Sequence, residues 1–118
     1  MPGVSIHVVD VSRGVIAAGM TVELHALVAD AAPRPIAKGT IAAGGTWDEP
    51  LLQQRFAVGV YEARFHVGAY YREAAIAVPR VPFLDVVVYR FGIDDGAQHY
   101  HLPFKCTPWG YSCFRGGA

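Results

Sequence analysis

Two histidines, His99 and His101, lie one residue apart near the end of the sequence, in the segment HYHLPFKC. Side chains alternate between the two faces of a strand, so both imidazoles point one way, with Lys105, while Tyr100 and Leu102 point the other way. An imidazole has an unperturbed pKa of about 6.5, which lets it accept a proton from water and return it near neutral pH. The pair is therefore a candidate for general base catalysis, although a histidine on the outer face of a strand is often only solvated.

Two further residues, His7 and Arg115, could join this pair. His7 lies opposite the apolar side chains of its own segment, so three imidazoles converge if the first strand pairs with the strand that holds the later histidines. Three neutral imidazoles can also hold zinc and leave a position open for water, but no cysteine or carboxylate stands at a spacing that supports a metal site. Arg115 could hold a carboxylate or urea-like oxygen, or stabilise an oxyanion. From its spacing alone, however, it reads as a solvated terminal charge.

The common signatures of other reaction classes do not occur. The sequence has no GxSxG, no GxxxxGK[ST], no GxGxxG and no HExxH. The usual motifs of serine hydrolases, nucleotide-binding enzymes and zincins are therefore missing. Histidine and arginine remain as the side chains able to carry chemistry.

Period-two alternation of apolar and polar residues dominates the chain and predicts strands that would position these groups. The clearest run is residues 20–28, with Thr21, Glu23 and His25 turned outward. Residues 70–77, YYREAAIA, are rich in helix formers and predict one short helix. The predicted strands cover residues 4–9, 20–28, 36–41, 59–66, 83–91, 99–106 and 111–115. This spacing predicts an all-β fold, an antiparallel β-sandwich of seven to eight strands, as a single domain over residues 1–118.

Composition narrows the classes of partner. Hydrophobic residues make up 53% and charged residues 17% of the chain, and Lys+Arg equals Asp+Glu at 10 each, so the sequence predicts no binding to nucleic acid or to a membrane. Low charge without net sign favours self-association. The first residues show no signal peptide pattern, and a cytoplasmic location is expected. Cys106 and Cys113 are expected to be buried free thiols.

Three segments together resemble the transthyretin-like family: IHVVDVSRGVIAAGMTVEL (residues 6–24), GVYEARFHVGAYY (59–71) and HYHLPFKCTPWGYSCFRGG (99–117). The last segment resembles the ending of the family's enzymatic branch, 5-hydroxyisourate hydrolase, whose pattern is His-Tyr-His-x-Pro, then Pro-x-x-Tyr, then Tyr-Arg-Gly-Ser. The resemblance implies a two-sheet sandwich that dimerises edge to edge and pairs again into a homotetramer, with active sites in the channel between dimers. It also implies a reaction in which water attacks a cyclic acyl group and opens the ring of 5-hydroxyisourate.

Carried over by position, the resemblance makes His7, His101 and Arg115 the candidate catalytic residues. His101 would be the general base on water, His7 would position the water or protonate the leaving nitrogen, and Arg115 would hold the substrate's oxygens. The chain departs from the family pattern at two glycines: Gly45 stands where the site arginine is expected and Gly117 where the terminal serine is expected. Phe114 replaces the tyrosine of the terminal tetrapeptide.

The absent guanidinium must be replaced for full activity, because removing one oxyanion donor costs about 2.7–4 kcal/mol. His99, Lys105 and the indole N–H of Trp47 are the candidate replacement donors. With Gly45, Phe114 and Gly117 they make up the expected substrate-binding set, and no metal or cofactor is expected.

Two hypotheses about function follow. In the first, the protein is a hydrolase that opens 5-hydroxyisourate or a related cyclic amide in purine degradation or a related catabolic pathway, with a substrate that the two glycines could have altered. In the second, it is a non-catalytic small-molecule binding protein, as transthyretin is, and the two glycines favour this alternative.

Overall fold

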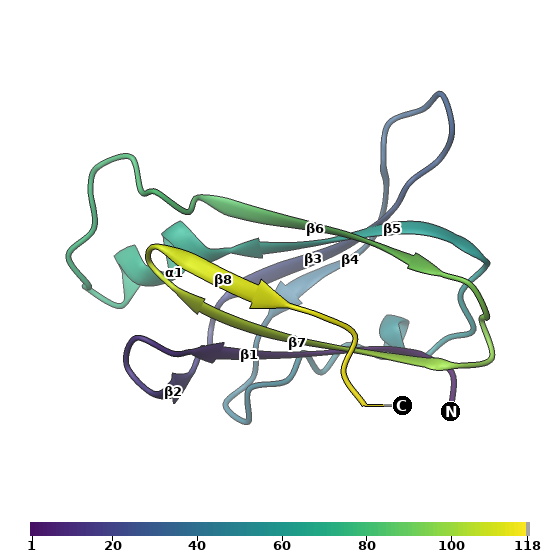
Figure 1. Ribbon diagram of the computed structural model, residues 1–118, viewed down its shortest axis with the longest axis horizontal. Helices are drawn as coiled ribbons and strands as arrows, with labels where there is room; N and C mark the ends of the chain where they lie inside the picture. The colour runs from purple at the N-terminus through teal and green to yellow at the C-terminus, as the bar shows by residue number, and fades with distance from the viewer. Residues whose placement is uncertain (118) are drawn as a thin grey trace.

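The computed structural model describes residues 1–117 and shows two four-stranded sheets packed face to face (Figure 1). The helix α1 lies at one end of the sandwich, and the N-terminus and the segment that follows β8 lie toward the other end. In spatial order the first sheet contains β2 (Val15–Ile16), β1 (Gly3–Asp10), β7 (His99–Thr107) and β8 (Gly110–Cys113). The second contains β4 (Arg34–Thr40), β3 (Thr21–Ala26), β5 (Gly59–His66) and β6 (Val86–Ile93). The predicted all-β sandwich is confirmed.

Alternating side chains produce the core between the two sheets. Every second residue of β1 is buried, and the intervening residues from Ser5 to Val9 are only partly buried. β7 shows the same pattern, and its Phe104 stacks on Phe65 of β5 with ring centroids 3.8 Å apart, which links the two sheets. The faces opposite the core therefore carry the polar residues of β1 and β7.

The pairing of β1 with β7 brings the two ends of the chain together. These strands run parallel, with Ser5 opposite His101 and Gly3 opposite His99. All other strand pairs are antiparallel, so the antiparallel pattern that the sequence predicts holds except at this pair. The expected meeting of the first strand with the penultimate strand is confirmed.

The helix and two short elements differ from the prediction. α1 spans Val67–Glu73 rather than residues 70–77, because the chain turns directly from β5 into the helix and buries Tyr70 and Tyr71. Ala75 has a positive φ of 58°, which stops the helix before the predicted end. β6 likewise begins three residues later than the predicted strand at 83. The two-residue strand β2 and the 3₁₀ helix η1 (Pro50–Leu52) are not predicted.

A buried carboxylate, Asp10, fastens α1 to the end of β1. It accepts hydrogen bonds from the hydroxyl of Ser12 at 2.6 Å, from that of Tyr71 at 2.7 Å and from Nε of Arg13 at 2.8 Å. Burial alone would raise the pKa of Asp10, but these bonds and a further one from Tyr70 outweigh it and lower the pKa. The charged group therefore holds the helix to the sheet that carries the histidines.

Both cysteines are free thiols, as expected. Cys106 is buried and Cys113 is half-buried, and burial raises the pKa of their thiols to about 11 and about 12. Among residues 1–117, no helix is long and apolar enough to cross a membrane.

Candidate active site

A serine joins the two histidines of β7 on the outer face of the first sheet. The Oγ atom of Ser5 lies 2.8 Å from Nε2 of His99 and 2.6 Å from Nδ1 of His101. The three side chains meet because the parallel register places Ser5 directly opposite His101, one strand away. All three are half-buried, so they are accessible from solvent yet shielded on one side.

His7 lies two residues further along β1, on the same face as Ser5. A loop segment crosses the free edge of β1 at this point, with an isolated bridge between His7 and Thr46. The carbonyl of Gly45 accepts a hydrogen bond from the N–H of Val8 at 2.9 Å. Gly45 has a positive φ of 91°, and a Cβ built there would lie 2.6 Å from Nε2 of His7. The imidazole therefore occupies the space that a side chain at position 45 would need.

The C-terminal tail runs back over β7. The N–H of Gly116 donates to the carbonyl of His101 at 2.6 Å, and a Cβ at position 116 would lie 2.8 Å from Cδ2 of that imidazole. The guanidinium of Arg115 donates to Oε1 of Gln98 at 3.1 Å and to the carbonyl of His99 at 3.2 Å. It also lies over the ring of Tyr100, 4.0 Å from the centroid. Arg115 is thus held beside His99, with its donors directed to β7.

The surroundings of His101 favour its neutral form. Burial lowers the pKa of His101 below its ordinary value of 6.5, and the nearby His99 and His7 lower it further, because a second positive charge would be repelled. A neutral imidazole is the form that accepts a proton. His7, His99 and His101 therefore act on one another electrostatically, as the convergence of the two strands predicts.

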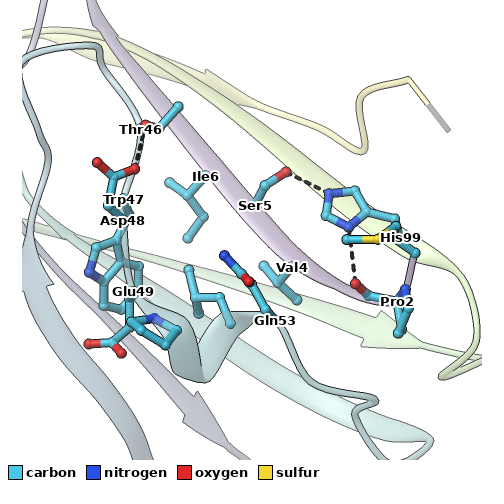
Figure 2. Close-up of a pocket in the computed structure, with 13 residues that line it drawn as sticks. Pro2, Val4, Ser5, Ile6, Thr46, Trp47, Asp48, Glu49, Gln53 and His99 are labelled. Atoms are coloured by element: carbon cyan, nitrogen blue, oxygen red, sulfur yellow. Dashed lines mark hydrogen bonds between the residues drawn. The ribbon is translucent and has the colours of Figure 1, made fainter.

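A cavity of about 600 Å³ opens beside the serine and His99 (Figure 2). Its floor is apolar and includes Val4, Ile6 and Leu52, and Asp48 and Glu49 stand at its rim. Its volume lies within the range of roughly 300–1,000 Å³ that is typical of sites for small molecules. The cavity is lined from β1, from η1 and from the segment that follows Gly45.

The remaining substrate-binding candidates lie in different places. Trp47 is a core residue that also lines the cavity. Its indole Nε1 lies against Gly39 of β4. Nζ of Lys105 lies 5.9 Å from the ring centroid of Phe114, which is exposed. Gly117 is exposed, and no atom within 4 Å would meet a Cβ there.

Sequence reasoning missed Ser5 and Thr46. Alternation alone places Ser5 on the face of His7, so its position was available from the pattern. Its contact with two imidazoles depends on the parallel register with β7, which the pattern does not give. Thr46 Oγ1 donates to Oδ1 of Asp48 at 2.9 Å, at the same rim of the cavity.

The arrangement suits proton transfer at a bound small molecule. Within residues 1–117, no group of three or more His, Cys, Asp or Glu side chains is arranged to hold a metal ion. The zinc alternative therefore has no ligand set in this part of the chain. A neutral imidazole, flanked by two others and open to solvent on one side, can act as a base on water.

Comparisons with known proteins identify relatives over nearly the full length of the chain. The 5-hydroxyisourate hydrolase of Deinococcus radiodurans is 40% identical over 116 residues, which cover 98% of this chain and 96% of that protein. The enzyme of the same name from Halalkalibacterium halodurans is 41% identical over 114 residues, covering 96% of each chain. The family model described as HIUase/Transthyretin family matches residues 4–116.

Solved structures agree with the fold. The structure of Klebsiella pneumoniae 5-hydroxyisourate hydrolase superposes with a TM-score of 0.80 at 26% identity and covers 99% of this chain and 100% of that chain. Sea bream transthyretin in complex with thyroxine superposes with a TM-score of 0.84 at 24% identity and 98% coverage of both chains, which shows the fold alone. The resemblance to the transthyretin-like family is confirmed, and the chain belongs to the HIUase/Transthyretin family.

Proposed function

We propose that the protein is a hydrolase that opens the ring of 5-hydroxyisourate. The relatives that carry this name match nearly the full length of the chain. The observation that carries the proposal is the half-buried imidazole of His101, whose pKa is lowered by burial and by two neighbouring histidines. Such a group is neutral and basic where the reaction needs a proton acceptor.

In the proposed mechanism the substrate binds over the outer face of β1 and β7. His101 takes a proton from water, and the oxygen attacks the carbonyl carbon of the cyclic amide. The carbon–nitrogen bond then breaks, and the leaving nitrogen takes a proton from His7 or from the protonated His101. The ring opens with the net addition of one water molecule, and the two imidazoles return to their initial states by proton exchange with solvent.

Arg115 supplies the positive charge for the substrate's oxygens. Its guanidinium donates to an exposed glutamine and to a backbone carbonyl, and on binding it would exchange the glutamine for a substrate oxygen. Gly45 projects no side chain, and the neighbouring Thr46, which is bridged to His7, lines the cavity with its hydroxyl donating to Asp48. We propose that Arg115 and Thr46 compensate for the arginine that is missing at position 45.

A direct test mixes the purified protein with freshly generated 5-hydroxyisourate and follows the ultraviolet absorbance. The expected result is decay well above the rate in buffer, and a fall in kcat of about 10²–10⁴ in His101→Ala, the range for a general base. His66→Ala is the matched control, because His66 lies on β5 of the second sheet and forms a hydrogen bond with Glu23 of that same sheet. Decay no faster than in buffer would exclude the assignment.

A small-molecule carrier is the second candidate, favoured by the lack of a side chain at Gly45 and Gly117. Calorimetry with aromatic and purine-like ligands separates the two functions. A carrier binds such a ligand without consuming it, whereas the hydrolase converts 5-hydroxyisourate under the same conditions.

We further propose that the protein works as a homotetramer. Each sheet ends in a strand with one free edge, β6 in one sheet and β8 in the other. Exposed apolar side chains lie on and beside these edges, among them Val88, Trp109 and Tyr111. Free edges and exposed apolar surface are the features that pairing with a second copy covers.

A further inference from the structure

Within residues 1–117, Ser5 is the one residue whose hydroxyl contacts two of the imidazoles. Its Oγ lies 2.8 Å from Nε2 of His99 and 2.6 Å from Nδ1 of His101. Both distances are those of strong hydrogen bonds. A serine hydroxyl carries a single proton, so it donates to one imidazole and accepts from the N–H of the other. The protonation sites of His99 and His101 are therefore coupled through Ser5.

The backbone of Pro2 selects between the two arrangements. Nδ1 of His99 lies 3.5 Å from the carbonyl oxygen of Pro2, and Figure 2 shows His99 between this oxygen and Ser5. A carbonyl oxygen only accepts. This long contact is attractive when Nδ1 of His99 carries the hydrogen. It is repulsive when the lone pair of Nδ1 faces the lone pairs of the Pro2 oxygen.

The proton positions then follow along the chain of contacts. With the hydrogen of His99 on Nδ1, Nε2 of that ring would accept from the hydroxyl of Ser5. The same oxygen would then accept from Nδ1–H of His101, which would leave the lone pair of His101 on Nε2. Cδ2, the ring atom next to Nε2, lies against Gly116, which has no side chain to cover this edge of the ring.

We propose that Ser5 is a positioning residue: together with His99 and the carbonyl of Pro2 it holds His101 in the Nδ1–H tautomer and so presents Nε2 as the basic atom. This inference rests on the role of His101 in the proposed function. When Nε2 of His101 takes a proton from water, Nδ1–H of the same ring keeps its hydrogen bond to Ser5. The hydrogen bonds among His101, Ser5 and His99 therefore need not rearrange during the reaction. The lowered pKa of His101 agrees with a neutral ring.

The tautomer is measured first in the unmodified protein. With ¹⁵N-labelled histidine, long-range ¹H–¹⁵N correlation spectra distinguish a protonated from an unprotonated ring nitrogen. The expected spectrum has the proton of His101 on Nδ1 at a pH where the ring is neutral. A proton on Nε2 overturns the proposal, and this measurement needs neither a variant nor activity.

Three variants then test the part played by Ser5. In Ser5→Ala we expect the Nδ1–H signature of His101 to weaken and kcat to fall about 10–100-fold, the usual effect of losing a residue that orients a reacting group, with little change in KM. Ser5→Thr keeps the hydroxyl and is expected to restore both. Ser112→Ala is the matched control, because Ser112 is an exposed serine on β8 of the same sheet.

Unchanged tautomer and kcat in Ser5→Ala would overturn the proposal. If the unmodified protein shows the Nδ1–H tautomer but does not consume 5-hydroxyisourate, the proposed function fails while the role of Ser5 in the tautomer stands. The two failures are therefore distinguishable.

Discussion

Two glycines lie against two imidazoles of the candidate site. Gly45 leaves room for the ring of His7, and Gly116 leaves room for that of His101. A side chain at either position would meet the ring within 3.0 Å, closer than carbon atoms approach in proteins. The two glycines therefore leave the space that the rings of His7 and His101 occupy, while Ser5 of the neighbouring strand contacts Nδ1 of His101.

Gly45→Ala is expected to displace His7. Alanine is strained at a φ of 91°, at a cost of about 1–3 kcal/mol, and its methyl group would meet Nε2 of His7. We expect lower stability in urea denaturation together with a loss of hydrolysis. Gly44→Ala is the matched control, because nothing lies within 4 Å of a Cβ there. Equal activity in the two variants would contradict the packing of His7 on Gly45.

The pH dependence of hydrolysis should follow His101. Because the pKa of His101 lies below 6.5, the neutral base persists to lower pH, and kcat/KM should rise along an acidic limb with its midpoint below that value. The titratable groups that lower this pKa are His99 and His7, and Lys105 lies on the same face of β7. The His7→Asn variant removes one neighbouring positive charge, so the pKa of His101 should rise in a proton NMR titration.

His66, on the second sheet, is the internal reference: its resonance should be the same in the unmodified protein and in His7→Asn at each pH. A midpoint for His101 at or above 6.5 in the unmodified protein would show that burial and neighbouring charge do not control the ring.

At the scale of elements, the link between α1 and β1 depends on one carboxylate. Asp10 is fully buried, and four side chains donate to it. A charged group without such donors would be costly at this depth. The hydrogen bonds make the ion tolerable, and they tie the helix to the strand that also carries Ser5 and His7.

Asp10→Asn is expected to lower the free energy of unfolding by about 1.5–3 kcal/mol at neutral pH, the scale of a hydrogen bond to a charged group. The pKa of Asp10 is lowered in the fold from 3.8, so its contribution is fully present above that pH and is lost as the pH falls through the folded-state value. Urea denaturation from neutral to acidic pH measures both effects.

The difference between Asp10→Asn and the unmodified protein should therefore shrink in acid. Asp94→Asn, which changes an exposed carboxylate, is the matched control and should leave stability nearly unchanged. A constant difference at all pH values would mean that the charge of Asp10 has no part in the network.

Alternation predicted most strands and the common face of His7 and His101, because burial on one side imposes a period of two. It could not give the ends of α1, which depend on the positive φ of Ala75 and on tyrosines packed against Asp10. Nor could it give the contacts of Ser5, since a register between strands distant in the sequence is set by the whole sandwich.

At the scale of the whole molecule, the edge strands are β2 and β8 in one sheet and β4 and β6 in the other. β6 and β8 each pair on one side only, and apolar side chains are exposed along them. Natural proteins protect such edges, often with lysine. Here the edges carry few charges, which supports assembly of several copies.

Val88→Lys on β6 is expected to reduce the size of the assembly in sedimentation velocity, because a lysine at an edge that pairs with its own copy places like charges together. Val58→Lys is the matched control: Val58 is 68% exposed and Val88 49% exposed, but Val58 precedes β5 and lies on no free edge. An unmodified protein that sediments as a monomer would contradict the proposed tetramer.

The pairing of β1 with β7 also affects the order in which the protein can mature. Ser5 and His101 are 96 residues apart in sequence, so the strand synthesised first must wait for one of the last before its main partner exists. Contacts of such long separation form slowly, and an unpaired strand is prone to aggregation meanwhile. During translation the second sheet can form ahead of the first, and the face that carries Ser5, His99 and His101 is assembled only after β7 has emerged from the ribosome.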